Sequence, residues 1–474
     1  MATIGPASAD PSTLRALIDA GLDVVRLNLS HGELDEHLDE LELVRRVADD
    51  AGRHVAVLAD LPGPKIRSGR FPEGGVTLEG GSTVRLVPGD GPSDDATIHV
   101  QYDTLLADLV AGAKVQLGDG AISMTVTEVG AAAALACIES GGRANGQPGV
   151  HLSSDLLRLE TPTADDLVLA EAVAEAGVEF VAVSFVREAR DVEAVREVVG
   201  ERARLVAKIE TRAALDDLAG IVRASDAVMV ARGDLGIDCP IEDVPHLQKR
   251  IVRHCVEIGK PVITATQMLE SMISAPSPTR AEVSDVANAV FDGTDALMLS
   301  GETAIGRDPL GVVRTMAAIA ERAESEASYR QWANMLGRKQ RELSSEVAPG
   351  TRITMAMSHA ASQAAMDADI TAILCCTRSG RTARAIARFR PEARMVGLSP
   401  DAAMVRTMAL TWGVEPMKVE SYGSTDEMVW FAVEKALEEH VVEHGDSVLV
   451  LAGAPGRDGA PVVATDVLRI VRVD

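Results

Sequence analysis

Short apolar runs alternate with helix-length segments over much of the chain. Apolar runs of about four to eight residues are typical of strands buried on both faces of a sheet. We expect strands at residues 2–5, 23–30, 55–60, 180–185, 205–210, 227–234, 261–267 and 296–300. Strands separated by helices in this way predict a (β/α)8 barrel. A doubly wound open sheet is the alternative, because periodicity alone does not show whether the sheet closes.

The segments between these runs predict helices at residues 11–20, 33–51, 188–199, 212–224 and 242–258. Asp10 precedes Pro11, and Ser277 precedes Pro278. A capping residue followed by proline indicates a helix start, so we expect Asp10 and Ser277 to be N-caps.

Residues 69–152 interrupt this rhythm with glycine and short alternating runs, at 76–78, 83–87, 96–100, 114–117 and 122–126. They predict a small all-β domain, inserted after the third barrel strand, where it would act as a lid.

Residues 325–349 are polar and indicate a linker or bridging helix. Strand-like runs at 372–376, 395–399, 415–419, 448–452 and 468–473 predict a second α/β block. The domains we expect are a barrel (1–68 and 153–345), a β lid (69–152) and a C-terminal domain (346–474).

Composition narrows the class of partner. The 474 residues carry a net charge of −25, which argues against nonspecific binding to nucleic acid or an anionic membrane. The chain lacks an apolar stretch of the roughly 18–20 residues that span a bilayer, and we see no signal peptide at its start. The five cysteines form no C-x-x-C pair, which favours reduced thiols and a cytoplasmic location.

Two apolar runs end in pairs of charges, Lys208 with Glu210 and Arg232 with Asp234. Alternate residues of a strand share a face, so each pair is predicted to point the same way. The carboxyl ends of parallel strands are where α/β proteins place their active sites. Two carboxylates beside a lysine indicate a divalent metal that holds an anionic substrate. A surface ion pair is the alternative for Lys208 and Glu210, but the apolar residues between and before them favour burial.

Most of the other predicted strands also end in polar residues. They are Arg26, Asn28 and Ser30, Asp60 with Lys65 and Arg67 after it, Ser184, Thr266 with Gln267, and Ser300 with Glu302. Any one of them alone would be read as a helix cap or a loop residue. Together they suit a phosphorylated carboxylic acid, because basic groups such as Lys208, Arg26 and Arg67 neutralise a transferring phosphoryl group. Neither a Walker A loop nor a G-x-G-x-x-G loop is present.

At these residues the chain resembles the pyruvate kinase family. The motifs that carry the resemblance are Arg26-Leu-Asn-Leu-Ser-His-Gly32, Asp60-Leu-Pro-Gly-Pro-Lys-Ile-Arg67, Lys208-Ile-Glu210, Met229-Val-Ala-Arg-Gly-Asp-Leu-Gly236, Pro278-Thr-Arg-Ala-Glu282 and Leu297-Met-Leu-Ser-Gly-Glu-Thr303. The match covers nearly the whole predicted barrel. It implies the last step of glycolysis, in which phosphoenolpyruvate passes its phosphoryl group to ADP, giving pyruvate and ATP.

The resemblance also implies roles for individual residues. Glu210 and Asp234 would hold Mg²⁺ or Mn²⁺, and Lys208 would stabilise the charge of the transferring phosphoryl group and the enolate. Arg26 and Arg67 would contact phosphate, and the Ala231-Arg232-Gly233 backbone with Thr266 would hold the substrate carboxylate. Thr266 and Ser300 would belong to the route that protonates the enolate. The remaining nucleotide contacts would be Asn28 and His31, beside Arg67.

A monovalent-cation site is implied at Asn28, Ser30, Asp60 and the Leu61 carbonyl. Potassium-dependent relatives carry Glu where this chain has Lys65. A fixed ammonium supplies the charge that K⁺ otherwise supplies, so we expect activity largely independent of K⁺.

The C-terminal block resembles the family's effector domain. Its Thr377, Ser379, Gly380, Arg381 and Thr382 lie between a predicted strand and a predicted helix, where hydroxyl and backbone N–H groups suit a phosphate. We expect a phosphorylated activator there, with a simple strand-to-helix turn as the alternative. The family also implies a homotetramer.

Two other functions remain open. One is a metal-dependent carbon–carbon lyase of the related phosphoenolpyruvate barrels, and the other is a catalytically inactive effector-binding paralogue. The family usually has a strand before the Ala-Thr-Ile-Gly-Pro segment that begins here at residue 2. We therefore expect that the first barrel strand is short or that the chain is truncated, and either one would weaken barrel closure.

Overall fold

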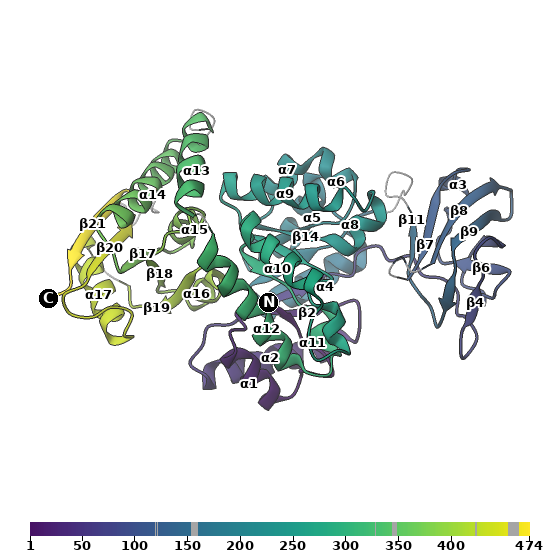
Figure 1. Ribbon diagram of the computed structural model, residues 1–474, viewed down its shortest axis with the longest axis horizontal. Helices are drawn as coiled ribbons and strands as arrows, with labels where there is room; N and C mark the ends of the chain where they lie inside the picture. Colours follow the sequence, from purple (N-terminus) through teal and green to yellow (C-terminus); the bar gives the residue numbers. More distant parts are fainter. Residues whose placement is uncertain are drawn as a thin grey trace.

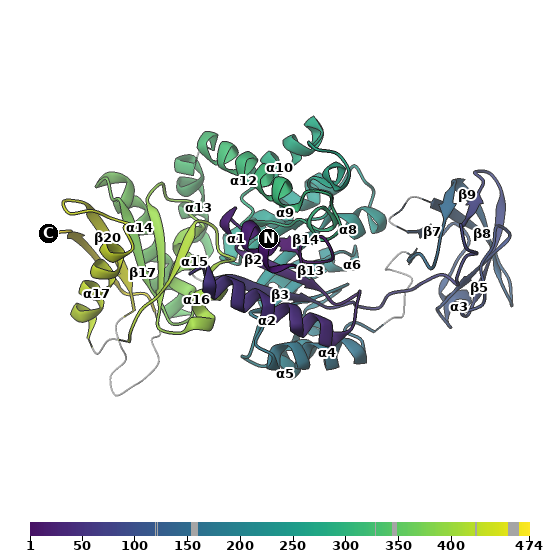
Figure 2. The ribbon, with the colours of Figure 1, turned by 90° about the horizontal axis from the view of Figure 1, so that it is seen from below.

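The structure is a computed structural model that describes residues 1–118, 120, 122–152, 160–327, 329–343, 348–421, 424–453 and 464–474. Three parts lie in a row (Figure 1). A barrel occupies the centre, a β unit lies on one side of it and a C-terminal α/β unit on the other. Seen from below, the parts keep this order (Figure 2). The boundaries proposed between them stay predictions, and position 345/346 lies outside the described residues.

The central sheet has eight parallel strands in the order β1-β2-β3-β12-β13-β14-β15-β16. Their bounds are β1 Ala2–Thr3, β2 Val24–Asn28, β3 Ala56–Asp60, β12 Phe180–Val183, β13 Arg204–Ile209, β14 Ala227–Ala231, β15 Val262–Ala265 and β16 Ala296–Leu297. The sheet closes because Ala2 pairs with Leu299 and the Thr3 N–H donates to the Leu299 carbonyl at 3.0 Å. The (β/α)8 prediction is confirmed. β1 is short as expected, but the expected weak closure is wrong, because these backbone bonds join β1 to the last strand.

The helices of the barrel cover the outside of this sheet (Figures 1 and 2). They are α1 Pro11–Asp19, α2 Leu34–Asp50, α4 Ala164–Glu175, α5 Ala189–Val199, α6 Ala213–Asp216, α7 Leu218–Ala224, α8 Arg232–Asp238, α9 Val244–Ile258, the 3-10 helix Glu270–Ile273, α10 Arg280–Asp292, α11 Gly301–Ala304 and α12 Pro309–Glu326. Asp10 caps α1 as predicted, accepting from the N–H groups of Ser12 and Thr13. The Ser277 prediction is wrong. Thr279 is the N-cap of α10, because Thr279 and Glu282 form a capping box.

Alternate residues of the barrel strands face two different cores. Along β13, Leu205, Ala207 and Ile209 belong to the core shared with the helices. Val206 instead packs inside the barrel with residues of other strands such as Leu58. Lys208 follows Val206 at the strand period of two, so the same alternation directs its side chain to the barrel interior at the carboxyl end.

The strand predicted at 227–234 is too long. β14 ends at Ala231, and α8 begins at Arg232. Arg232 and Asp234 therefore lie on the first turn of a helix, where residues two apart do not face the same way.

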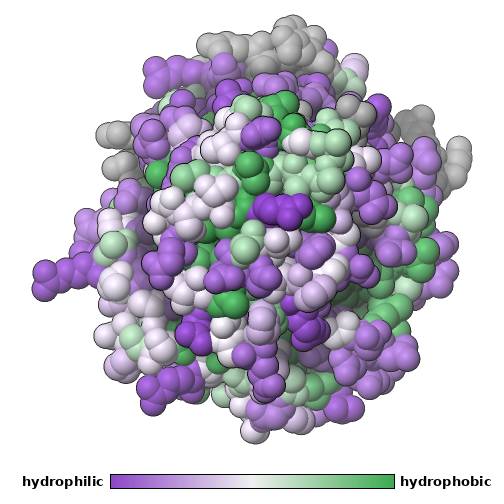
Figure 3. Space-filling model, turned by 90° about the vertical axis from the view of Figure 1, so that its right-hand side faces the viewer, coloured by the Kyte–Doolittle hydropathy of each residue, from purple (hydrophilic) through white to green (hydrophobic). Residues whose placement is uncertain are grey.

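The β unit contains a six-stranded sheet in the order β11-β7-β8-β9-β5-β6 and the separate pair β10-β4. Its elements are β4 Val76–Leu78, β5 Thr83–Pro88, β6 Thr97–Val100, α3 Leu105–Asp108, β7 Lys114–Leu117, β8 Ile122–Val129, β9 Ala134–Ser140, β10 Gly142–Ala144 and β11 Val150–Leu152. It has a core of its own, which includes Val84, Ile98 and Met124. Figure 3 views the molecule from the side of this unit, and hydrophilic side chains are spread over the face that it shows.

The C-terminal unit is a five-stranded sheet in the order β19-β18-β17-β20-β21, with β21 antiparallel to its neighbour. Its elements are α13 Tyr329–Leu343, α14 Pro349–Asp367, β17 Ala372–Cys376, α15 Arg381–Ala387, β18 Arg394–Ser399, α16 Ala402–Met408, β19 Val414–Lys418, α17 Thr425–Glu438, β20 Ser447–Ala452 and β21 Val467–Arg472. The polar segment at 325–349 contains the helix α13. Of the two structures predicted there, a linker or a bridging helix, the described part is therefore a helix. Within the described parts of the chain, we find no helix with the length and apolarity to cross a membrane.

Candidate active site

A buried lysine forms the centre of the site at the carboxyl ends of the barrel strands. The Lys208 ammonium lies 2.9 Å from Glu210 Oε1, 3.1 Å from Asp60 Oδ1 and 2.8 Å from Ser184 Oγ. Burial disfavours its charge, but the carboxylates of Asp60 and Glu210 outweigh that effect and raise the pKa of Lys208 above its ordinary value. Lys208 therefore stays an ammonium and acts as a fixed positive charge.

Glu210 is held from two sides. Oε2 accepts from the Phe185 N–H at 2.7 Å, and Oε1 faces Lys208. Burial, opposed by Lys208 and reinforced by the negative charge of Asp234, raises the pKa of Glu210 to about 7. A cation between two neighbouring acids in a buried site stabilises their charged forms, so Glu210 and Asp234 fit a divalent metal.

Asp60 joins the lysine to an arginine. Its carboxylate lies 2.7 Å from Arg26 Nη2, and Arg26 also donates to Thr3 Oγ1 at 3.0 Å. Asp60 is fully buried, yet Lys208 and Arg26 together keep its pKa below the ordinary value. These distances show that Arg26, Asp60 and Lys208 lie together at the carboxyl ends of the strands.

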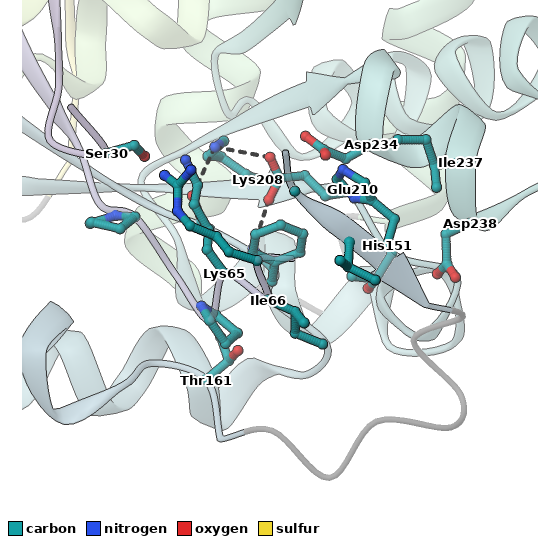
Figure 4. A pocket seen from close by; sticks show the side chains of 18 of the residues that line it. Ser30, Lys65, Ile66, His151, Thr161, Lys208, Glu210, Asp234, Ile237 and Asp238 are labelled. Atoms are coloured by element: carbon teal, nitrogen blue, oxygen red, sulfur yellow. Dashed lines mark hydrogen bonds and ion pairs between the residues drawn. The ribbon is translucent and has the colours of Figure 1, made fainter. Parts of the chain in front are cut away.

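These groups open into a pocket of ≈ 370 Å³ that lies between the barrel and the β unit. The pocket is lined by Arg26, Asn28, Ser30, His31, Lys65, Arg67, His151, Thr161, Ser184, Phe185, Arg187, Lys208, Glu210, Thr211, Asp234 and Asp238, among others. In Figure 4 the carboxyl groups of Glu210 and Asp234 lie beside each other, next to Lys208. The lining includes Gly118, Gly149 and Val150 of the β unit, so this unit borders the pocket.

Arg232 is the one charge of the predicted cluster that points elsewhere. Its guanidinium lies 2.6 Å from Asp285 and donates to the carbonyls of Ala265 at 3.2 Å and Thr266 at 2.8 Å. The prediction that four charges converge is therefore wrong for Arg232, because the turn into α8 redirects its side chain. Arg232 instead holds the loop that follows β15, through its bonds to the Ala265 and Thr266 carbonyls.

That loop carries Thr266 in a left-handed conformation, with φ of 67°. Thr266 Oγ1 accepts from the Gly233 N–H at 2.8 Å, so the loop is tied to the start of α8. A threonine rarely adopts this conformation, and the surrounding bonds maintain it. Among the described residues, the pocket lining does not include Ala231, Arg232, Gly233, Thr266 or Ser300, nor the predicted cation ligands Asp60 and Leu61.

Three predicted residues line the mouth of the pocket. Lys65 is exposed there, and partial burial together with the positive charges of Lys208 and Arg67 lowers its pKa. His31 is also exposed, and partial burial with Lys65 and Arg67 nearby lowers its pKa. Arg67 Nη1 approaches the Gln147 carbonyl of the β unit at 3.4 Å. The mouth is therefore strongly positive, which suits an anionic substrate.

Sequence reasoning missed several residues of this pocket. Phe185 holds Glu210 through its backbone, and Arg187, Thr211, His151 and Asp238 line the cavity. Ser184, noted as a strand end but given no role, binds Lys208 and donates to the Leu61 carbonyl at 2.7 Å. Arg187 and Thr211 come just after predicted strands, so their position in the sequence could have indicated that they line the pocket. His151 carries no comparable signal, because it comes from the β unit.

The predicted effector residues lie far along the chain, at the turn from β17 into α15, and Arg381 and Thr382 are the first two residues of α15. Thr382 is buried, and its hydroxyl lies 2.8 Å from the Thr465 hydroxyl. Thr377 is buried as well, Gly380 is left-handed with φ of 68°, and Arg381 is exposed. The loop therefore offers Arg381 to solvent, whereas the Thr382 hydroxyl already has a partner.

A closed barrel with a buried acid–lysine cluster at the carboxyl ends of its strands defines the class as a (β/α)8 enzyme. Residues 1–313 match the family described as "Pyruvate kinase, barrel domain", and residues 355–471 match "Pyruvate kinase, alpha/beta domain". The chain belongs to the pyruvate kinase family.

Similar proteins cover nearly its whole length. It is 38% identical to a pyruvate kinase of Clostridium acetobutylicum, over 96% of this chain and 95% of the relative. It is 39% identical to a pyruvate kinase of Methylorubrum extorquens, over 100% of this chain and 96% of the relative. A Mycobacterium tuberculosis pyruvate kinase is also 39% identical, over 99% of this chain and 97% of the relative.

Proposed function

We propose that this chain transfers the phosphoryl group of phosphoenolpyruvate to ADP, giving pyruvate and ATP. One observation carries the proposal. A permanently charged lysine lies between two buried carboxylates, and a third acid, Asp234, stands beside one of them at the pocket wall. Such a site holds an anion and a cation together, which phosphoryl transfer requires.

Glu210 and Asp234 are the residues that would hold Mg²⁺ or Mn²⁺. The metal would neutralise charge on the phosphoryl oxygens when bound. Lys208 would stabilise the negative charge of the phosphoryl group and of the enolate that it leaves. Burial makes the ammonium effective, because a fixed charge in a poorly solvated site interacts more strongly than one in water.

The mouth of the pocket would receive the nucleotide. Arg67, His31 and Asn28 line it and are the proposed contacts for ADP, and Arg26 and Arg67 would contact phosphate. The Ala231–Gly233 backbone and Thr266 would hold the substrate carboxylate, with Thr266 and Ser300 on the route of the proton to the enolate. The β unit would close over the nucleotide and exclude water, which otherwise competes for the phosphoryl group.

Asn28, Ser30, Asp60 and the Leu61 carbonyl are the proposed monovalent-cation ligands. Asp60 is already neutralised by Arg26 and Lys208, which supports a reaction that does not depend on K⁺. Lys65, at the pocket wall, would supply the additional positive charge.

The loop of residues 377–382 is the proposed site for a phosphorylated activator, and the enzyme is proposed to act as a cytoplasmic homotetramer. Because the Thr382 hydroxyl is engaged by Thr465, Ser379 is the better test of a hydroxyl contact. Ser379→Ala should weaken activation by a sugar phosphate or AMP, and unchanged activation would move the site elsewhere.

A coupled assay tests the central proposal. Pyruvate should appear from phosphoenolpyruvate only when ADP and Mg²⁺ are both present, and ATP should form in equal amount. Lys208→Met should lower kcat by about 10²–10³-fold, the range seen when one donor to a developing charge is removed. Pyruvate release without ADP would point to a lyase, and no turnover would point to an inactive effector-binding protein.

A further inference from the structure

A histidine behind the pocket holds one of its walls. Residues 28–32, here called the mouth loop, connect the end of β2 to the start of α2, and Asn28, Ser30 and His31 of this loop line the pocket. His37 lies in the first turn of α2 and is not part of the pocket lining. Its ring nevertheless contacts the backbone of the mouth loop, at the His31 carbonyl.

Both ring nitrogens of His37 face oxygen atoms. Nε2 lies 2.6 Å from the His31 carbonyl oxygen, and Nδ1 lies 3.0 Å from Glu40 Oε2. Carbonyl and carboxylate oxygens only accept hydrogen bonds, so each contact requires an N–H on the ring. A neutral imidazole has one N–H and an imidazolium has two, so this geometry calls for the charged ring.

The surroundings of His37 favour that state. The hydrogen bond to Glu40 raises the pKa of His37, partial burial opposes it, and the His31 carbonyl and the charge of Glu36 raise it further. The His37 side chain is 12% exposed, so water competes weakly for its two bonds. A hydrogen bond from a charged donor is also stronger than one between neutral groups.

Few other hydrogen bonds hold the mouth loop. Near its start the Leu29 N–H donates to the Asp60 carbonyl at 3.1 Å. At its end Gly32 is left-handed with φ of 77°, and a Cβ there would lie 3.5 Å from His37 Nε2, so the chain passes directly over the ring. Between these two points, and among the described residues, the one hydrogen bond from the loop backbone to another element is that of the His31 carbonyl with His37.

We propose that His37 is a positioning residue for the nucleotide, whose Nε2–H donates to the His31 carbonyl and fixes the mouth loop in the conformation that receives ADP. This inference rests on the proposed function, in which Asn28 and His31 contact ADP. His37 acts through the backbone of His31 and does not touch the nucleotide itself. Lys208 and Glu210 are held by Ser184 and Phe185, so loss of the His37 bond should weaken ADP binding and spare the chemical step.

Two neutral variants separate the two bonds of the ring. Glutamine places its amide nitrogen near the position of Nε2, so His37→Gln keeps a donor for the His31 carbonyl. Asparagine places its amide nitrogen near Nδ1, so His37→Asn keeps only a donor toward Glu40. The matched control is His246→Gln, at an exposed histidine of α9.

Steady-state kinetics of pyruvate formation compare these proteins. His37→Asn should raise the KM for ADP about tenfold, since a hydrogen bond from a charged donor contributes about that factor. Its kcat and its KM for phosphoenolpyruvate should stay within about twofold of the wild type, and the KM of His37→Gln for ADP within about threefold. His246→Gln should match the wild type in all three constants.

Hydrogen exchange measures the same bond without turnover. In the protein without ligands, the Leu29 and His31 amides should exchange about tenfold faster in His37→Asn than in the wild type, and close to the wild-type rate in His37→Gln. A wild type that forms no pyruvate with ADP contradicts the proposed function, and exchange then still tests the bond.

Three results would overturn the positioning role. One is an equal KM for ADP in His37→Asn and His37→Gln. Another is a lower kcat in His37→Asn with the KM for ADP unchanged, which would mark a purely structural histidine. The third is exchange of the mouth-loop amides at the same rate in the wild type and in His37→Asn.

Discussion

At the scale of single residues, the protonation states in the site depend on which opposite charges lie beside each group. Lys208 has two carboxylate neighbours and keeps its proton, whereas Glu210 is pushed toward neutrality by burial and by Asp234. A cation placed between Glu210 and Asp234 would lower the pKa of Glu210 again and keep its carboxylate charged. The arrangement therefore favours an electrostatic role for Lys208 over proton transfer.

Lys65 gives a prediction at this scale. Lys65→Glu replaces the ammonium at the pocket wall with a carboxylate, so the wall needs a cation from solution. We expect the wild type to work equally well in potassium and in tetramethylammonium salts. The variant should lose activity in tetramethylammonium and regain it in potassium. A hundredfold loss for the wild type on removal of K⁺ would contradict this account.

At the scale of elements, Arg232 connects α8 to the loop after β15. Arg232→Met leaves the carbonyls of Ala265 and Thr266 without that donor and releases Asp285. We expect a loss of about 1.5–3 kcal/mol in stability. A fall in kcat larger than the change in KM should accompany it, because Thr266 shifts. Thermal unfolding and steady-state kinetics measure both.

The matched control is Lys249→Met, which breaks the ion pair between the half-exposed Lys249 and Asp292. It should change stability by no more than about 1 kcal/mol and leave kcat intact. If the two variants behave alike, Arg232 does not position the Thr266 loop.

The start of α10 gives a second prediction at the scale of elements. Thr279→Ala removes the side chain that accepts from the Glu282 N–H, and should cost about 1 kcal/mol in stability. Ser277→Ala, two residues earlier and also exposed, should fall within about 0.5 kcal/mol of the wild type. Equal midpoints for the two variants in thermal unfolding would mean that the capping box contributes nothing.

These elements also show what the sequence could predict. Lys208 and Glu210 were placed together correctly, because the strand period of two holds through β13 and just past it. Asp234 was brought to the same pocket for the wrong reason, since the chain turns into α8 at Arg232. The sequence contains both the Thr279–Glu282 spacing of a capping box and the Ser277-Pro278 pair, and only the first marks the start of α10.

Other features had no local signal. The left-handed Thr266 is imposed by bonds to Gly233 and Arg232, which come from another element. Strand β9 was missed because Ala134–Ser140 lies in an alanine-rich stretch of weak β-propensity.

At the scale of the whole molecule, Glu179 joins the barrel to the C-terminal unit. Its buried carboxylate accepts from Arg406 of α16 at 2.6 Å, from Arg45 of α2 at 2.8 Å and from the Val57 N–H at 2.8 Å. Arg406→Met removes the contact from the C-terminal unit and leaves Arg45 in place. We expect a loss of about 1.5–3 kcal/mol, seen in calorimetry as a separation of the unfolding of the two parts.

Arg394→Met is its control, because the Arg394–Glu415 pair lies within the C-terminal unit and is about half exposed, at 45% and 44%. It should change stability by about 0–1 kcal/mol. A single unchanged transition for Arg406→Met would mean that this ion pair does not hold the parts together.

The most direct test of the account is an anomalous diffraction measurement on crystals grown with Mn²⁺. We predict one manganese peak in the pocket beside Lys208, with one oxygen of Glu210 and one of Asp234 each at about 2.1 Å. The peak should vanish after chelation and in Glu210→Gln crystals. A manganese ion bound by one of these carboxylates alone, or at another place while this pocket stays empty, would contradict the proposed chemistry.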